Sequence, residues 1–202
     1  MKLKVYDFDD TLAVSKGVIR LHRESGWKKV YNSEEFVSYT PLSGDLLCFS
    51  DLNHLTQVRL ILNNWEEMVS DLSDHQTDVM IVTSRPPGAA SAITKLLEYH
   101  GLLFPHVLSS PVSRVHALGS GNPKDKVLTI DRALQIRKYE YVRFVDDNPK
   151  MVEAVKSYFG DKLECEWDAD HHSHDNITEQ NLSPVLGDFL SDNYEVWQQK
   201  VR

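Results

Sequence analysis

The sequence contains only two cysteines, Cys48 and Cys165, which are too few for a disulfide framework. We interpret both as ordinary packing residues. Long apolar runs are also missing, because a stretch such as Val79–Val82 is far too short to span a bilayer. The opening residues MKLKVYDFDD lack the apolar segment that a signal peptide needs. These absences favour a soluble, cytoplasmic protein without a membrane partner.

Basic residues are scarcer than acidic ones, since 22 Lys and Arg stand against 30 Asp and Glu, for a formal net charge of −8. This balance excludes a nucleic-acid-binding coat over the whole chain. The deficit lies mainly in Asp161–Arg202, with ten acidic and three basic residues. Val14–Tyr31 is the exception, because its one acid, Glu24, accompanies Lys16, Arg20, Arg23, Lys28 and Lys29. This segment is either a basic patch for an anionic substrate or a solvated hairpin face.

Segments typical of strands and helices alternate through the first 160 residues. The chain has 202 residues, of which 41% are hydrophobic and 26% charged, so it can form one globular domain. The hydrophobic periodicity predicts strands at Leu3–Phe8, Asp78–Val82, Val107–Leu108 and Tyr141–Val145, and helices at Leu52–Leu72, Ala89–His100, Asn122–Arg137 and Met151–Phe159. This alternation predicts an α/β fold, with helices on both faces of a Rossmann-like parallel sheet in three layers.

Two regions depart from this alternation. Val14–Tyr39 is rich in β-forming residues and is broken by glycines, which predicts a β-hairpin insert after the first strand, at about residues 14–50. The domain is expected to span residues 1–162, followed by an acidic C-terminal tail, 163–202, with one helix near Pro184–Gln198. The tail includes His171-His172-Ser173-His174, which could bind a transition metal. Its crowded spacing is unlike a structural zinc site, so we interpret it as an exposed polar segment.

Polar clusters follow three of the predicted strands. They are Asp7-Phe8-Asp9-Asp10-Thr11, Thr83-Ser84-Arg85 and Asp146-Asp147-Asn148. Because the carboxyl ends of parallel strands meet at one edge of a sheet, we expect the three clusters to lie together. Crowded carboxylates raise one another's pKa unless a cation neutralises them, and Mg²⁺ takes such oxygen ligands. Two lysines at a predicted helix start, Lys124 and Lys126, could each neutralise a phosphoryl charge.

The order and spacing of these clusters resemble the haloacid-dehalogenase-like (HAD) hydrolase superfamily, over about residues 1–160. The first motif of that family, DxDx[TV][LV], is matched by Asp7, Asp9, Thr11 and Leu12. Thr83 matches the second motif, a Ser or Thr that ends a hydrophobic strand. The third motif is a lysine, and the fourth is an acidic pair matched by Asp146 and Asp147.

The region between the motifs resembles uncharacterised phage-encoded HAD-like proteins, which have a hairpin insert and no full cap domain. Their third motif is a proline followed by Lys-Ala-x-x-Ile. The segment Pro123–Ile130 aligns Lys126 with that lysine, with Val127 in place of alanine. We therefore prefer Lys126, and Lys124 is the alternative. A phage-encoded protein of this kind would work in the host cytoplasm.

The resemblance implies a role for each matched residue. Asp7 would be the nucleophile that forms an aspartyl-phosphate, and Asp9 the general acid and base. Thr83 and Lys126 would hold the phosphoryl oxygens, and the expected substrate-binding residues are Thr11, Ser84 and Arg85. The expected Mg²⁺ ligands are the carboxylates of Asp7, Asp146 and Asp147 and the backbone carbonyl of Asp9.

These roles predict a Mg²⁺-dependent phosphatase that acts on phosphomonoesters. Without a cap the site would be open, which in this superfamily is typical of enzymes with large substrates such as nucleic-acid ends. Trp27 and Tyr31 in the basic insert could stack on bases, so nucleic acid or nucleotides are the favoured partners. The alternatives are a phosphatase of small metabolites and a non-catalytic HAD-like binding module. The sequence gives no indication of the oligomeric state.

Overall fold

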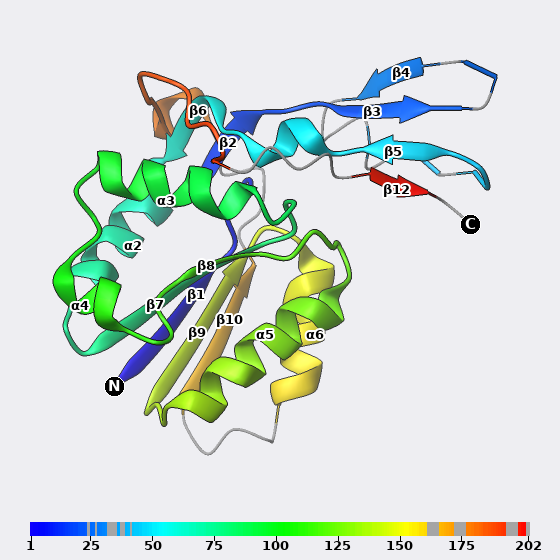
Figure 1. Cartoon of the computed structure of the whole chain (residues 1–202). Helices are drawn as coiled ribbons and strands as arrows, with labels where there is room; N and C mark the ends of the chain where they lie inside the picture. The colour runs from blue at the N-terminus through cyan, green and yellow to red at the C-terminus, as the bar shows by residue number, and fades with distance from the viewer. Residues whose placement is uncertain are drawn as a thin grey trace.

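A five-stranded parallel sheet forms the body of the protein (Figure 1). The computed structural model describes residues 1–23, 25–26, 28–31, 36, 39–40, 42–160, 166–171, 177–192 and 198–200. The strand order is β10-β9-β1-β7-β8, and every neighbouring pair runs parallel. The strands are β1 (Lys2–Tyr6), β7 (Thr77–Thr83), β8 (Val115–Ala117), β9 (Tyr141–Asp146) and β10 (Glu166–His171).

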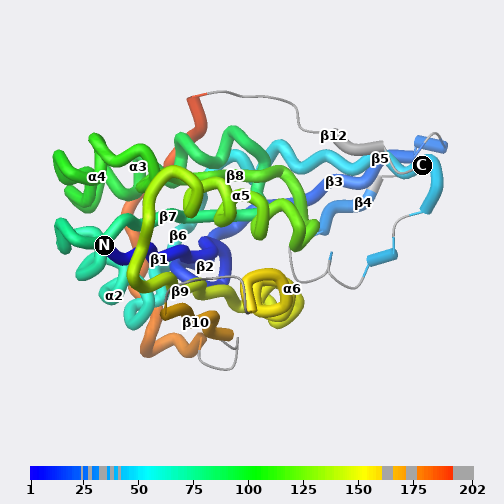
Figure 2. The backbone as a smooth tube through the Cα atoms, turned by 90° about the horizontal axis from the view of Figure 1, so that it is seen from below, coloured from blue at the N-terminus to red at the C-terminus, as the bar shows by residue number. Residues whose placement is uncertain are grey.

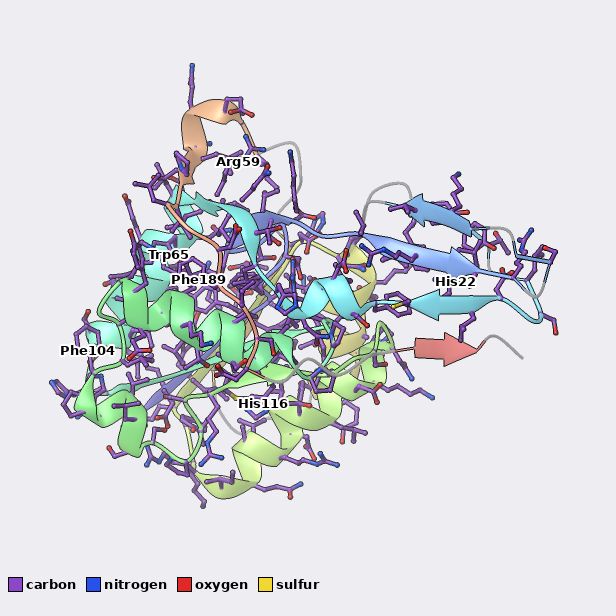
Figure 3. All side chains as sticks on the ribbon, turned by 45° about the horizontal axis from the view of Figure 1, so that its top comes forward. His22, Arg59, Trp65, Phe104, His116 and Phe189 are labelled. Carbon is purple, nitrogen blue, oxygen red and sulfur yellow. The ribbon has the colours of Figure 1, made fainter. Side chains whose placement is uncertain are left out.

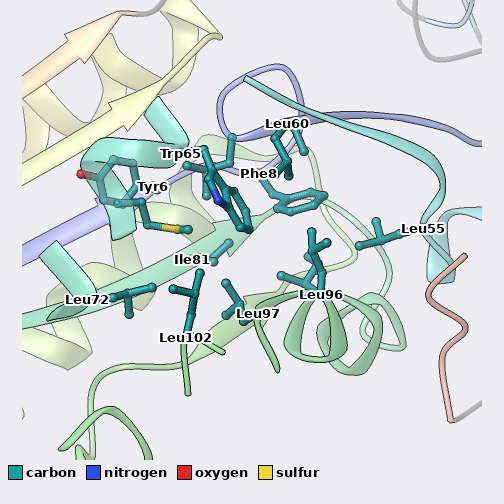
Figure 4. Packing of buried hydrophobic residues seen from close by; sticks show 14 of the residues in the cluster. Tyr6, Phe8, Leu55, Leu60, Trp65, Leu72, Ile81, Leu96, Leu97 and Leu102 are labelled. Carbon is teal, nitrogen blue, oxygen red and sulfur yellow. The ribbon is translucent and has the colours of Figure 1, made fainter. Parts of the chain in front are cut away.

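Helices cover both faces of this sheet. One face packs against α2 (Leu62–Ser73) and α3 (Ala89–Tyr99), in a core that includes Tyr6, Trp65 and Leu96 (Figure 4). The other face packs against α5 (Pro123–Ile136) and α6 (Pro149–Phe159). Alternation along β1 directs Leu3 and Val5 into this second core. The chain is therefore α/β, and its three layers are compatible with a Rossmann-like fold.

Local sequence explains where the two helices nearest the candidate site begin. Asn122 precedes α5, and its side chain accepts a hydrogen bond from the backbone N–H of Lys124 at 3.1 Å. Asn148 precedes α6 and accepts from Lys150 in the same way, at 3.0 Å. A proline follows each asparagine at the first helical position, where its missing N–H costs nothing. Both helices therefore start at fixed points beside the ends of the strands.

Antiparallel strands connect β1 to β7. They are β2 (Ala13–Lys16), β3 (Ile19–His22), β4 (Lys28–Tyr31), β5 (Leu46–Cys48) and β6 (Thr56–Ile61), with the 3-10 helix η1 (Ser50–Asn53) between the last two. One small sheet has the order β11-β6-β2 and includes β11 (Leu182–Pro184). The other, β12-β5-β3-β4, includes β12 (Gln198–Lys200) and projects from the body (Figure 1). Figure 2 shows β3, β4 and β5 at the end of the molecule far from the N-terminus. The expected insert, 14–50, lies partly outside the described residues.

Two predicted elements near the middle of the chain were wrong. The helix predicted at Leu52–Leu72 begins only at Leu62, because Thr56–Ile61 pairs as β6 with β2 and buries Val58 and Leu60. The strand predicted at Val107–Leu108 lies in the short helix α4 (Pro105–Ser109), which begins at a proline. The strand at that edge of the sheet is β8.

The C-terminal region also differs from the predicted tail. The parallel sheet extends beyond residue 162, because β10 pairs with β9 along its whole length. Ala169 is the one buried residue of this edge strand. Its sequence therefore does not show the alternation of apolar and polar residues that identifies a strand. The helix expected near Pro184–Gln198 is absent from the described part of that range, which begins within β11. Residues 193–197 lie outside the described residues. No helix in the described part of the chain has the length and apolar character to cross a membrane.

Candidate active site

The three predicted polar clusters meet at the carboxyl edge of the parallel sheet. Asp7 follows β1, Thr83 ends β7 and Asp146 ends β9. The Asp7 backbone N–H donates to the carbonyl of Val145 at 2.9 Å, which holds the first cluster against the end of β9. In the sheet β1 lies between β7 and β9. The chain passes from β1 to β7 and β8 on one side, and then returns to β9 and β10 on the other side of β1. In open α/β sheets ligands bind at such a reversal of strand order.

A buried lysine bridges the two innermost carboxylates. Lys126 on α5 contacts Asp7, and its Nζ lies 2.7 Å from Oδ2 of Asp146. The side chains of all three residues are at most 7% exposed. Oδ1 of Asp146 accepts the backbone N–H of Asn148 at 2.8 Å. The structure thus brings Lys126 into the cluster, whereas Lys124 is exposed at the start of α5.

The charges of this cluster are unbalanced. Burial raises the pKa of Asp7 well above its usual value, Lys126 opposes this rise, and Asp146 adds to it. Burial alone would lower the pKa of Lys126, but attraction to Asp7 and Asp146 outweighs it and raises that pKa. One ammonium therefore faces two buried carboxyl groups.

A third carboxylate completes a possible cation site. Oxygen atoms from Asp7, Asp146 and Asp147 all lie within 4.8 Å of one another. Three carboxyl groups around one ammonium suit a hard divalent cation, and Mg²⁺ prefers such oxygen ligands. The expected fourth ligand, the backbone carbonyl of Asp9, belongs to the same loop as Asp7. The three carboxyl groups could therefore hold a divalent cation.

The loop after β1 folds into a tight turn that positions Thr11. Asp10 adopts a left-handed conformation with φ of 57°, and the carbonyl of Phe8 accepts two backbone N–H groups, those of Leu12 at 2.9 Å and Ala13 at 3.0 Å. The buried Thr11 hydroxyl accepts the backbone N–H of Asp147 at 3.0 Å and lies 3.4 Å from its carboxylate. The structure therefore places Thr11, an expected substrate-binding residue, against Asp147.

The second carboxylate of the loop, Asp9, pairs with Arg85. Nε of Arg85 lies 3.0 and 2.9 Å from the two Asp9 oxygens, and Nη2 lies 2.7 Å from Oδ1. Thr83 Oγ1 lies 3.4 Å from Oδ2 of Asp9 and accepts the backbone N–H of Arg85 at 3.2 Å. Ser84 is half-buried between them in sequence. The second cluster thus contacts the general acid that the sequence predicts.

His171 also lies at this site, although the sequence pattern did not indicate it. It ends β10 in register with Asp146, and its Nε2 lies 2.8 Å from the backbone carbonyl of Asp147. Like the three predicted clusters, His171 lies at the carboxyl end of a strand. The strand itself was not predicted, because β10 is mostly polar. His172 and His174 lie outside the described residues.

Acidic partners reduce the charge of the basic segment. Arg20 pairs with Asp51, and Nε of Arg23 lies 2.7 Å from Oδ1 of the buried Asp45. Hydrogen bonds lower the pKa of Asp45 to about 2, with the larger effect from Arg23 and a smaller one from Tyr39. Figure 3 shows His22 on the same projecting sheet.

Two lysines of the basic segment have no acidic partner among the residues that the structure describes. Lys16 and Lys29 form no ion pair with any residue that the structure describes, although Nζ of Lys29 lies 4.4 Å from the centre of the Tyr31 ring. Trp27 and the side chain of Lys28 lie outside the described residues. The described part of the segment is therefore less basic than its sequence.

Comparisons with known proteins identify no relative. No family model, no curated protein and no solved structure matches this chain.

Proposed function

We propose that this chain is a Mg²⁺-dependent phosphomonoester hydrolase of the HAD type. One observation carries the proposal: the buried Asp7–Lys126–Asp146 arrangement at the carboxyl ends of β1 and β9, with Asp147 close enough to share a cation. A carboxylate beside a lysine and a cation site is suited to attack an anionic phosphoryl group, because the positive charges offset the repulsion between the two anions.

The proposed reaction has two steps, formation of an aspartyl-phosphate and its hydrolysis. A carboxylate oxygen of Asp7 attacks phosphorus, and the bond to the leaving oxygen breaks. Asp9, which enters this step protonated, donates its proton to that oxygen. Asp9 then takes a proton from water, whose oxygen attacks the phosphorus of the aspartyl-phosphate. The bond between Asp7 and phosphorus breaks, which releases inorganic phosphate and restores the carboxylate. Thr83 and Lys126 donate hydrogen bonds to the phosphoryl oxygens during both steps.

The electrostatics of the cluster support a role for both cations. Burial favours the neutral form of Asp7, and a protonated carboxyl is a poor nucleophile. Lys126 counteracts this effect through its contact with Asp7. Mg²⁺ bound by Asp7, Asp146 and Asp147 would neutralise further negative charge on the protein and the substrate.

Access to the site bears on the substrate. We interpret the antiparallel strands between β1 and β7 as an insert beside an open site, since the Asp9 side chain is 39% exposed. An open site would admit the phosphorylated end of a nucleic acid or a nucleotide. The pairing of Arg20 with Asp51 and of Arg23 with Asp45 favours a second candidate, a small phosphorylated metabolite, because fewer charges remain to hold a polyanion.

A substrate panel tests the proposed function. Phosphate release would be measured with Mg²⁺ on nucleotides, sugar phosphates, phosphopeptides and oligonucleotides with 3′ or 5′ phosphates. We expect activity in the wild type, none in Asp7→Asn, and a large loss in Lys126→Met. Lys124→Met is the matched control, because this exposed lysine lies on the same helix and outside the cluster. Phosphate release by Asp7→Asn at the wild-type rate would refute the covalent mechanism.

A further inference from the structure

The guanidinium of Arg85 is buried and fully engaged by the protein. Its side chain is only 4% exposed. Nε and Nη2 donate to Asp9, and Nη2 also lies 2.5 Å from the hydroxyl of Ser15 on β2. Nη1 donates to the carbonyl of Leu52 in η1 at 3.0 Å and to that of His54 at 3.1 Å.

Counting donors excludes one of the two roles that an arginine could have here. A guanidinium has five N–H donors, one on Nε and two on each Nη. Arg85 directs its Nε donor and one Nη2 donor at Asp9, the other Nη2 donor at Ser15, and both Nη1 donors at backbone carbonyls. An arginine that binds a phosphoryl group must keep donors directed at the substrate, and Arg85 keeps none.

We propose that Arg85 is a positioning residue for Asp9 and not a substrate ligand, an inference that rests on the proposed function. The side chain joins the general acid to β2 and to the end of η1, so that the antiparallel region fixes where the Asp9 carboxylate lies. Phe8 contributes to this arrangement, because its ring centre lies 5.8 Å from Cζ of Arg85. A general acid must lie within hydrogen-bond reach of the leaving oxygen, so a displaced Asp9 would protonate it poorly.

This role predicts a loss that depends on the leaving group. Protonation matters most for a phosphate ester of an alkyl alcohol and least for 4-nitrophenyl phosphate, whose phenolate leaves readily. General acid catalysis contributes about 10²–10⁴-fold, so we expect Arg85→Gln to lower kcat/KM for the alkyl ester by roughly 10²-fold. The expected loss for 4-nitrophenyl phosphate is about threefold or less, because little of that acid contribution is needed. The ratio kcat/KM isolates the steps up to phosphoryl transfer.

Two further variants separate positioning from general structural damage. In the double variant with Asp9→Asn, Arg85→Gln should add less than about a twofold effect, because residues that act as a unit are not additive. Arg137→Gln is the matched control, since Arg137 also pairs with a buried aspartate, Asp78, at 2.8 Å but outside the site. Arg85→Lys keeps the charge and would recover part of the loss if it can reach Asp9.

A crystal structure of Arg85→Gln provides a test that needs no activity. We expect the Asp9 carboxylate to move, with the Asp7–Lys126–Asp146 contacts unchanged. An equal loss of kcat/KM for both esters, effects that multiply in the double variant, or an unmoved Asp9 would overturn the proposal. If Arg85→Gln does not fold, the two esters and the double variant are compared with Arg85→Lys, for which we expect a smaller loss that still falls mainly on the alkyl ester. Absence of phosphatase activity in the wild type would refute the proposed function instead, and the crystal structure would still decide the position of Asp9.

Discussion

Replacing Lys126 with methionine tests the charge balance of the candidate site. Methionine keeps most of the aliphatic volume of lysine, so the change removes the ammonium without leaving a large cavity. Asp7 and Asp146 then face each other in a buried environment with no cation between them. Removing one partner of a buried ion pair costs about 3–5 kcal/mol, and we expect Lys126→Met to lower the free energy of unfolding by that amount without metal.

The assay is urea unfolding of Lys126→Met, Lys124→Met and the wild type, each in EDTA and in excess Mg²⁺. A change at the exposed Lys124 should stay within about 0.5 kcal/mol, because surface substitutions have small effects. Mg²⁺ at 100 times its Kd would stabilise the folded state by about 2.7 kcal/mol, which should recover much of the loss. Equal midpoints for the two variants in EDTA, or no effect of Mg²⁺ on either, would refute the reasoning.

Four further predictions follow from the same contacts. Asp7→Asn should not lower the free energy of unfolding in EDTA, because it removes a buried carboxyl whose pKa is raised; a fall of several kcal/mol would contradict this. Asp147→Asn should weaken Mg²⁺ binding in a calorimetric titration, whereas unchanged affinity would exclude Asp147 from the cation site. The folded-state pKa of Asp45 is lowered to about 2, so its contribution to stability is present above the unfolded value of about 3.9 and is lost as pH falls towards 2; Asp45→Asn should remove this part of the acid dependence of unfolding. Lys29→Glu should slow the turnover of an oligonucleotide more than that of 4-nitrophenyl phosphate and less so in 1 M salt, where the Debye length is about 3 Å; equal losses would make the lysine irrelevant to substrate.

The sequence predicts that Asp7 and Asp146 lie close together, and the structure places both beside Lys126. Asp7 and Asp146 each end or follow a buried strand, and a parallel sheet brings those ends together. The pairing of Asp9 with Arg85 was not predictable in this way, because hydrophobic periodicity carries no information on where loop side chains point. Arg85 was expected to bind substrate, and only the structure shows which protein groups its five donors contact.

Edge strands and short apolar runs were also difficult to assign from the sequence. In β10 only Ala169 is buried, so the strand looks like part of a polar tail. Leu55, Val58 and Leu62 fit a helical spacing, yet Val58 belongs to a strand paired with β2. Patterns that short fit either structure, and the pairing partner decides between them.

The central place of β1 has a consequence for synthesis of the chain. β1 is translated before both of its neighbours, Thr77–Thr83 and Tyr141–Asp146. Until the ribosome has released those segments, both edges of this apolar strand lack their partners, and unpaired strand edges invite aggregation. Lys126 lies 119 residues after Asp7, so it can contact Asp7 only after that length of chain has been made. The site is therefore completed late, and a chain truncated before residue 146 would expose an unfinished sheet.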